Sequence, residues 1–129
     1  MSEAENTDRF FVSTPDRPVS STGRHIIIHT WSGSGPDYLH VHNNDDEAWY
    51  VIEGILTFRL GDSTVKAGPG TTVMAPAGTP HTYFEEDGPT KYLIILTPTL
   101  DLLISELHRT PYKDHGSVLR KYDSEIVGS

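Results

Sequence analysis

The chain has 129 residues, close to the common size of one domain, so we expect a single domain over residues 1–129. Its 18 acidic and 10 basic side chains give a formal net charge of -8, which would repel nucleic acid or an anionic membrane and favours a small neutral or cationic molecule as the partner. The absence of cysteine excludes a disulfide framework and thiolate metal ligands.

The first eight residues are polar and acidic, and they contain no apolar segment of the kind found in a secretion signal. We therefore expect a flexible N-terminus over residues 1–8 rather than a signal or an anchor. The longest apolar runs, at residues 26–28 and 93–96, are far too short to cross a bilayer. These features, with the lack of cysteine, predict a soluble cytoplasmic protein.

Short runs of β-branched and aromatic residues follow, separated by turn residues, which is typical of an all-β sandwich or barrel rather than of βαβ units. Gly54 and Gly61 each lie between two such runs, where glycine forms hairpin turns because it adopts positive φ at low cost. The runs predict an all-β jelly roll with strands at residues 10–13, 25–31, 38–42, 48–52, 55–60, 63–66, 72–74, 82–85 and 91–96.

The composition changes after residue 96 and predicts a helical C-terminal tail over residues 97–129. One apolar stripe at helical spacing is formed by Leu100, Leu103, Ile104 and Leu107. Thr99 is the expected N-cap of this helix, and a second short helix is expected at residues 117–122. We expect both helices to pack against the outside or the mouth of the barrel, and a mobile lid over the site is the alternative.

Potential metal ligands occur in two short, glycine-punctuated stretches as His40, His42, Glu47 and His81. Successive side chains of a strand alternate between its faces, so His40 and His42 point the same way and can bind one ion. Neutral imidazoles with a carboxylate suit one divalent transition metal ion, and Fe, Mn, Ni, Co, Cu and Zn are all compatible with the set. Such a ligand set leaves one or two octahedral positions open for a substrate oxygen, water or dioxygen.

The spacing of these residues resembles the two sequence motifs of the cupin family. The first motif contains two histidines, a glutamate and a glycine, and is matched by His40, His42, Glu47 and Gly54. The second motif is matched in order by Gly70, Pro76, Gly78 and His81. The single copy of each motif resembles the small single-domain cupins of the cupin 2 type, which include relatives of the quercetin dioxygenases. The resemblance implies a jelly-roll barrel around the metal.

Two positions depart from the family pattern. Gly35 lies five residues before His40, where the family's glycine usually lies six before it, and Glu85 stands where the second motif usually ends in asparagine. Tyr83 and Glu85 share the strand face of His81, so both are candidate catalytic residues. In a dry, apolar site the pKa of Glu85 would rise and suit proton transfer, whereas at the barrel rim Glu85 would be a solvated charge.

Four further histidines lie outside the motifs. His25 and His29 share one strand face, which points either into the barrel or out of it. His108 and His115 lie in the tail, where we expect solvent exposure or a contact at a helix end, and neither is proposed as a ligand.

The resemblance implies a metal-dependent enzyme acting on a small organic molecule, with a quercetinase-like dioxygenase as the leading hypothesis. The first alternative is a non-oxidative isomerase, cyclase, lyase or decarboxylase, in which a Lewis-acid ion polarises a carbonyl while Glu85 or Tyr83 moves a proton. The second alternative is a cupin that binds a small molecule without catalysis, because a fold alone does not establish catalysis.

Small cupins commonly pair, so we expect a homodimer. Residues 9–20 are β-prone and are interrupted by Pro15 and Pro18. We expect this segment to cover an edge strand of its own barrel or of a neighbouring subunit.

Overall fold

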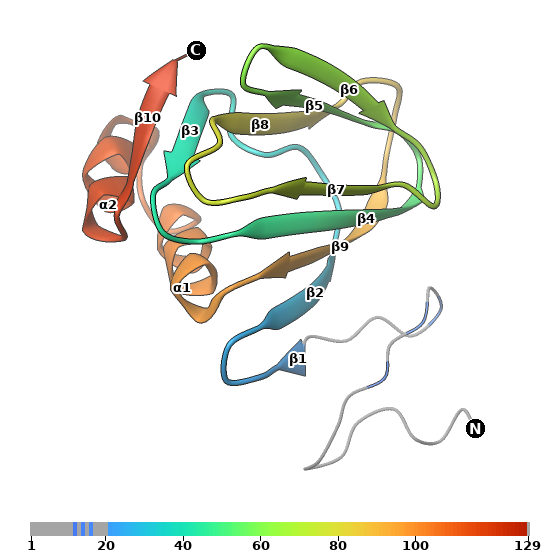
Figure 1. The fold of residues 1–129 in the computed structure, drawn as a ribbon, viewed down its shortest axis with the longest axis horizontal. Coiled ribbons are helices and arrows are strands. Elements are labelled where there is room, and N and C mark those ends of the chain that lie inside the picture. Colours follow the sequence, from blue (N-terminus) through green and yellow to red (C-terminus); the bar gives the residue numbers. More distant parts are fainter. Residues whose placement is uncertain (1–11, 13, 15, 17–20, 129) are drawn as a thin grey trace.

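In the described part of the chain, two five-stranded antiparallel sheets form the fold, with the strand orders β1-β2-β9-β4-β7 and β10-β3-β8-β5-β6 (Figure 1). This computed structural model describes residues 21–128 together with Val12, Thr14 and Asp16. The strands are β1 (Ser21–Thr22), β2 (Ile27–Trp31), β3 (Leu39–His42), β4 (Glu47–Glu53), β5 (Leu56–Leu60), β6 (Ser63–Ala67), β7 (Thr72–Ala75), β8 (His81–Glu85), β9 (Lys91–Leu96) and β10 (Ser124–Gly128). The all-β jelly-roll prediction is confirmed.

The N-terminal predictions fall almost entirely outside the described residues. They are the flexible segment at residues 1–8, the strand at 10–13 and the edge-covering segment at 9–20. From β2 to β9, the predicted strands occur in the predicted order, with ends that differ by a few residues. Strands β1 and β10 were not predicted.

The hairpin between β4 and β5 turns at Gly54, whose φ is 80°. A Cβ at this position would lie 2.5 Å from the carbonyl oxygen of Pro89. Both this steric clash and the positive φ therefore disfavour any residue other than glycine. The turn fixes the register of β4, in which Glu47, Trp49 and Val51 all point inward and are at most 5% exposed.

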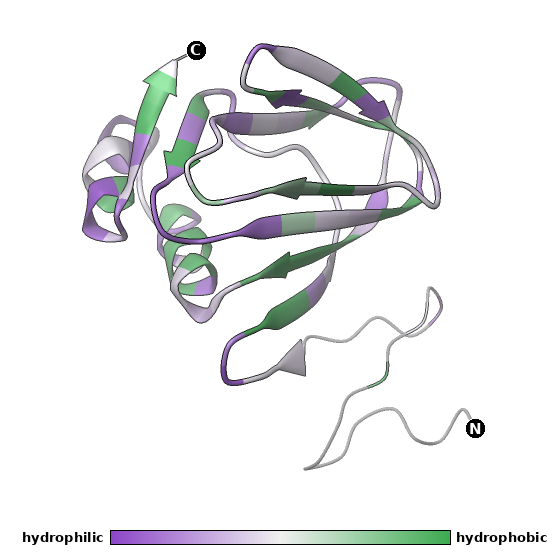
Figure 2. Ribbon diagram, viewed as in Figure 1, coloured by the Kyte–Doolittle hydropathy of each residue, from purple (hydrophilic) through white to green (hydrophobic). Residues whose placement is uncertain are grey.

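The space between the sheets is filled by apolar side chains from alternating strand positions. Strands β2, β7 and β9 are strongly apolar along much of their length (Figure 2). The side chains that are 0% exposed include Trp49, Val51, Leu56, Phe58 and Tyr92. This packing is a rigid support for the polar groups that lie at one end of the barrel.

Three helical segments connect β9 to β10 and lie together at that end: α1 (Pro98–Leu107), η1 (Tyr112–Asp114) and α2 (His115–Lys121) (Figure 1). The predicted cap of α1 is wrong, because Thr97 rather than Thr99 accepts a hydrogen bond from the Leu100 N–H. Pro98 occupies the first turn, where its missing N–H costs no hydrogen bond, so the helix begins earlier than expected. None of the described helices is both long enough and apolar enough to span a bilayer.

Candidate metal centre

Three strands bring together all four predicted ligands. His40 and His42 come from β3, while Glu47 and His81 are the first residues of β4 and β8. His40 and His81 are cross-strand partners in the β3–β8 pair. One potential ligand atom from each of the four side chains lies within 4.8 Å of the others, and all four residues are buried. The cluster could therefore hold one metal ion.

Hydrogen bonds from the imidazole rings to backbone carbonyl oxygens determine which ring nitrogen faces the cluster. His81 Nδ1 lies 2.8 Å from the carbonyl oxygen of Thr79, and His40 Nδ1 lies 3.4 Å from that of Tyr38. A carbonyl oxygen only accepts hydrogen bonds, so both Nδ1 atoms are the donors. In the neutral rings, Nε2 therefore carries the lone pair, as a metal ligand must.

Glu47 lies at the centre of the cluster. Its Oε1 is 3.2 Å from His42 Nε2 and 3.1 Å from His81 Nε2. Two atoms that both carry lone pairs repel at this distance unless a proton or a metal ion lies between or beside them. The arrangement thus fits a cation, and the nitrogen and oxygen donors suit a divalent transition metal.

The charge states of the buried groups match this interpretation. Burial raises the pKa of Glu47, but without a metal ion protonated His42 and His81 can donate hydrogen bonds to it from Nε2, and these bonds and their positive charge outweigh burial and bring the pKa to about 2. Burial lowers the pKa of His40 to about 3, with repulsion from His81 and His42 adding to the effect. Near neutral pH, Glu47 is therefore ionised and His40 is neutral, which are the forms that bind metals.

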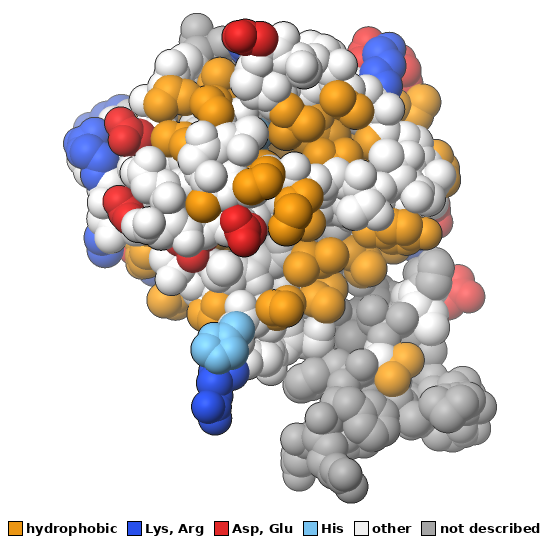
Figure 3. All heavy atoms as spheres, viewed as in Figure 1, with side chains coloured by type: hydrophobic (Ala, Val, Ile, Leu, Met, Phe, Trp, Pro, Cys, Tyr) orange, Lys and Arg blue, Asp and Glu red, His pale blue; other side chains and the backbone are white. Residues whose placement is uncertain are grey.

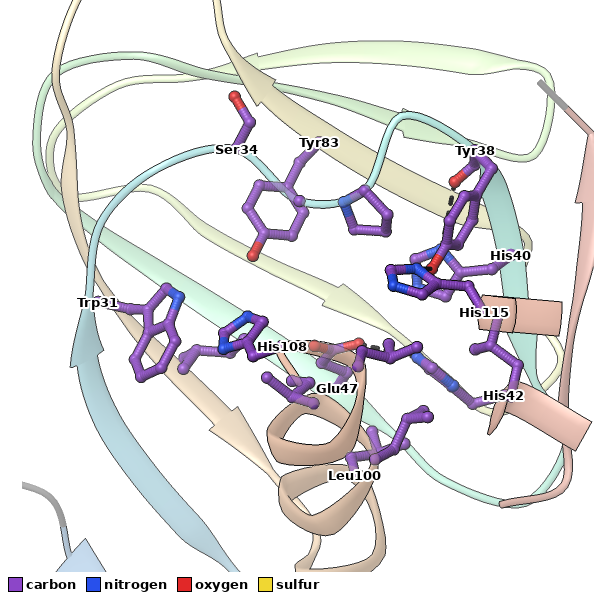
Figure 4. Close-up of a pocket in the computed structure, with 17 residues that line it drawn as sticks. Trp31, Ser34, Tyr38, His40, His42, Glu47, Tyr83, Leu100, His108 and His115 are labelled. Carbon is purple, nitrogen blue, oxygen red and sulfur yellow. Dashed lines mark hydrogen bonds and ion pairs between the residues drawn. The ribbon is translucent and has the colours of Figure 1, made fainter. Parts of the chain in front are cut away.

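A cavity of about 260 Å³ opens above the cluster (Figure 4). Figure 4 shows Trp31 at one side of it, His40, His42 and His115 at the other, and Glu47 between them. The apolar wall is built mainly by α1 and α2, from Leu100, Leu103, Ile104, Leu107 and Leu119. The tail therefore packs at the mouth of the barrel, as expected, and forms part of the cavity itself.

Tyr83 also lines the cavity and belongs to a buried chain of hydroxyl groups. The Tyr92 hydroxyl donates to the Gly33 carbonyl oxygen at 2.8 Å, so the 3.2 Å contact between the two phenols has Tyr83 as donor. Burial is the main cause that raises the pKa of Tyr83 to about 12. The phenol of Tyr83 is therefore neutral near pH 7, and its oxygen has lone pairs left to accept another hydrogen bond.

Glu85, the second candidate catalytic residue, lies at the rim and does not line this cavity. Its Oε2 accepts hydrogen bonds from the Thr90 hydroxyl at 2.7 Å, the Thr90 N–H at 2.8 Å and the Gly33 N–H at 3.1 Å. The hydrogen bond from the Thr90 hydroxyl is the main cause that lowers the pKa of Glu85, and together with the two backbone hydrogen bonds it outweighs the opposing effect of burial. This geometry supports the rim interpretation, in which an ionised Glu85 links the loop at Gly33 to the loop at Thr90.

His115 lies at a helix end, as the first residue of α2, but it also lines the cavity, which the sequence did not predict. The Tyr38 hydroxyl donates to His115 Nδ1 at 2.8 Å, while His115 Nε2 donates to the Thr110 carbonyl oxygen at 3.1 Å. His108 is exposed at the end of α1, as expected, but it also lines the cavity and stacks on Trp31 with ring centroids 5.8 Å apart. No motif signals these contacts, because they depend on how the tail folds back.

The other strand-borne histidines lie outside the cluster. His29 points inward and its Nε2 lies 2.7 Å from Asp101 Oδ1 of α1, where it lines a second cavity of about 270 Å³. His25 is exposed. The face of β2 that carries His29 therefore points inward, but His29 contacts the tail rather than the metal cluster.

Comparison with known proteins places this architecture in a family. The family model described as "Cupin domain" matches residues 27–96, more than half of the chain. The chain belongs to the cupin family. This cupin is 26% identical over 97 residues to quercetin 2,3-dioxygenase of Bacillus subtilis (strain 168), an alignment that covers 74% of this chain and 29% of that protein. It therefore spans less than a third of that relative's length.

Solved structures show the same fold. A protein of Thermus thermophilus matches with a TM-score of 0.55 at 24% identity, over 74% of this cupin and 97% of that chain. A putative sugar phosphate isomerase of Acidithiobacillus ferrooxidans matches with a TM-score of 0.51 at 26% identity, over 62% of this cupin and 58% of that chain. Relatives with this fold therefore carry names from more than one reaction class.

Proposed function

We propose that this cupin is a metal-dependent enzyme that acts on a small organic molecule, and that its reaction is a quercetinase-like dioxygenation. The observation that carries the proposal is the buried cluster of His40, His42, Glu47 and His81 beneath a largely apolar cavity. The distant similarity to a quercetin 2,3-dioxygenase supports the same reaction class.

The cavity favours a neutral substrate with an apolar or aromatic part. Among the described residues, its lining contains leucine, isoleucine, tyrosine and tryptophan side chains but no lysine or arginine. Apart from the proposed metal ion itself, these walls therefore offer a phosphate or carboxylate group no cationic side chain to pair with. A sugar phosphate, the substrate class in the name of one structural relative, fits these walls poorly, whereas a neutral enol or enediol fits them.

In this proposal, His40, His42, His81 and Glu47 hold the ion through Nε2 and carboxylate oxygen atoms. When bound, the metal supplies a Lewis acid and a path for electrons between an enol substrate and dioxygen. Tyr83 accepts a hydrogen bond from a substrate hydroxyl and so orients it, because its own proton is donated to Tyr92. The leucines of α1 exclude water from the bound substrate. We assign no proton transfer to Glu85.

One observation favours a non-oxidative reaction as the second candidate. Tyr38 and His115 form a hydrogen-bonded pair in the cavity wall, and such a pair can exchange a proton with a substrate. An isomerase, cyclase, lyase or decarboxylase would need such a group near the reacting carbonyl of its substrate.

Dioxygen consumption separates the two candidates. The protein is loaded anaerobically with each candidate metal, and uptake of dioxygen is recorded with flavonols and other neutral enols as substrates. We expect uptake that matches product formation and is absent from a His81→Ala variant. Product formation without oxygen uptake would establish the non-oxidative alternative, and a ligand recovered unchanged with every metal would support a binding protein.

We also propose a homodimer. Hydrophobic side chains gather on the face shown in Figure 3, over the β1-β2-β9-β4-β7 sheet. Ile26, Met74 and Tyr50 are 57%, 56% and 40% exposed, and an apolar sheet face of this kind is typical of a protein–protein contact. Light scattering should give a dimeric mass for the wild type and a monomeric mass for a Met74→Glu variant.

A further inference from the structure

Strand β10 places Ser124 directly behind the candidate metal centre. Ser124 is the cross-strand partner of His42 in the β10–β3 pair, and opposite side chains on one face of such a pair lie close together. The side chain is buried, with only 2% of Ser124 exposed. Its Oγ lies 2.8 Å from His42 Nδ1 and 3.2 Å from the Tyr122 carbonyl oxygen.

His42 differs from the other two histidines in what holds its ring. His40 and His81 each donate from Nδ1 to a backbone carbonyl only two residues away along the chain. His42 instead contacts a hydroxyl that lies 82 residues away. The orientation of this one ligand therefore depends on a segment outside both cupin motifs.

The hydroxyl group has the right chemistry for this contact. A serine hydroxyl has a single proton to donate, and the Tyr122 carbonyl oxygen can only accept it. When Ser124 donates to Tyr122, a lone pair on Oγ remains to accept the Nδ1–H of His42. The Nε2 atom of His42 then carries its lone pair toward Glu47, from which it is 3.2 Å away.

Backbone contacts hold Ser124 in place. The Asn43 N–H donates to the carbonyl oxygen of Asp123 at 3.0 Å, next to His42 on one side and to Ser124 on the other. The β10–β3 ladder continues from Ser124 through the positions that pair with Val41 and His40. The sheet therefore fixes the backbone position of Ser124, and with it the place of the hydroxyl beside His42.

We propose that Ser124 is a positioning residue for the metal centre: its hydroxyl holds His42 with Nδ1–H directed at β10 and Nε2 directed at the ion. This inference rests on the proposed metal-dependent function. Groups that orient metal-bound histidines typically change metal affinity about 10–100-fold when removed. Because the contact links β10 to the ion, metal binding and docking of the C-terminal strand stabilise one another.

The test compares Co²⁺ binding by the wild type and three variants, measured by visible absorption in competition with a chelator. We expect Ser124→Ala to raise the Kd of Co²⁺ about 10–100-fold. Ser124→Thr, which keeps the hydroxyl, should restore affinity close to the wild type. Thr57→Val is the matched control, because it removes another buried strand hydroxyl, one that binds Glu86 at 2.6 Å and does not contact the cluster. Unchanged affinity in a folded Ser124→Ala variant would overturn the proposal.

A second measurement needs no variant and decides the matter if Ser124→Ala does not fold. In long-range proton–nitrogen spectra of the Zn²⁺-loaded wild type, His42 should be protonated at Nδ1 and bound to zinc through Nε2. A His42 that is unprotonated at Nδ1 would refute the assignment. If the wild type binds neither Co²⁺ nor Zn²⁺, the proposed function fails and this inference fails with it. If the wild type binds the metal tightly and Ser124→Ala binds it equally tightly, only the inference is refuted.

Discussion

The candidate metal ligands and the cavity wall above them come from different regions of the chain and are stabilised by different forces. The ligands lie within residues 27–96, the segment that matches the cupin domain, and are held by hydrogen bonds between strands. Much of the wall comes from α1 and α2, which follow that segment and are held by buried leucines. If the proposed function holds, we expect that metal binding and substrate selection can be altered separately, except where Ser124 and the Tyr38–His115 pair join the two regions.

Removal of a ligand should have the largest effect. Glu47→Gln keeps the size of the side chain but removes its charge, so we expect metal affinity to fall by at least about 100-fold, more than the usual loss of an outer-shell contact. Glu85→Gln makes the same chemical change at the rim and should retain full occupancy. Elemental analysis after metal loading and gel filtration measures both. Stoichiometric metal in the Glu47→Gln variant would refute the assignment of the ligand set.

Truncation of a leucine in the tail should have the next largest effect. Leu100 is 0% exposed and lines the cavity, so Leu100→Ala should lower the free energy of unfolding by about 2–5 kcal/mol. Leu102, on the same helix, is 60% exposed, and Leu102→Ala should change stability by less than about 0.5 kcal/mol. Chemical denaturation of the metal-free proteins gives both values. Equal losses would show that α1 is not packed on the barrel as described.

Loss of the observed helix cap should have a smaller effect. Thr97→Ala removes the hydrogen bond to the Leu100 N–H and another to Asp45 at 2.8 Å, and it should cost about 1–2 kcal/mol. Thr99 is exposed and is not the N-cap, so Thr99→Ala should be close to neutral. Thermal unfolding of the two variants compares them directly. A larger loss for Thr99→Ala would restore the cap predicted from the sequence.

The smallest expected effect is a pH dependence at the rim. The pKa of Glu85 is lowered from 4.5 by the hydrogen bonds from Thr90 and Gly33, so the folded state binds its proton less readily than the unfolded state. The stabilising contribution is present above the unfolded pKa of 4.5 and is lost as the pH falls through the lower folded pKa. Acid titrations of unfolding should therefore be less steep for Glu85→Gln than for the wild type. Identical profiles would show that Glu85 makes no ionised contact.

Much of the barrel and the metal cluster could be predicted because their signals are local. Alternation along β3 places His40 and His42 on one face, and the glycine at position 54 indicates a tight turn whatever surrounds it. The cap of α1 also had a local signal that the prediction missed, since proline is favoured at the first helical position and Pro98 therefore indicates Thr97 as the N-cap. The structure adds a second contact of Thr97, with Asp45.

The sequence by itself determined the all-β fold, the cupin family and the identity of the four candidate ligands, because strand periodicity and motif spacing are properties of neighbouring residues. Only the tertiary structure decided that Glu85 lies at the rim, that His115 lines the cavity and that Ser124 supports His42. The contacts of His115 and Ser124 join residues far apart in the chain, since His115 follows Tyr38 by 77 positions and Ser124 follows His42 by 82. Such pairs carry no sequence period, because packing of the tail alone brings them together.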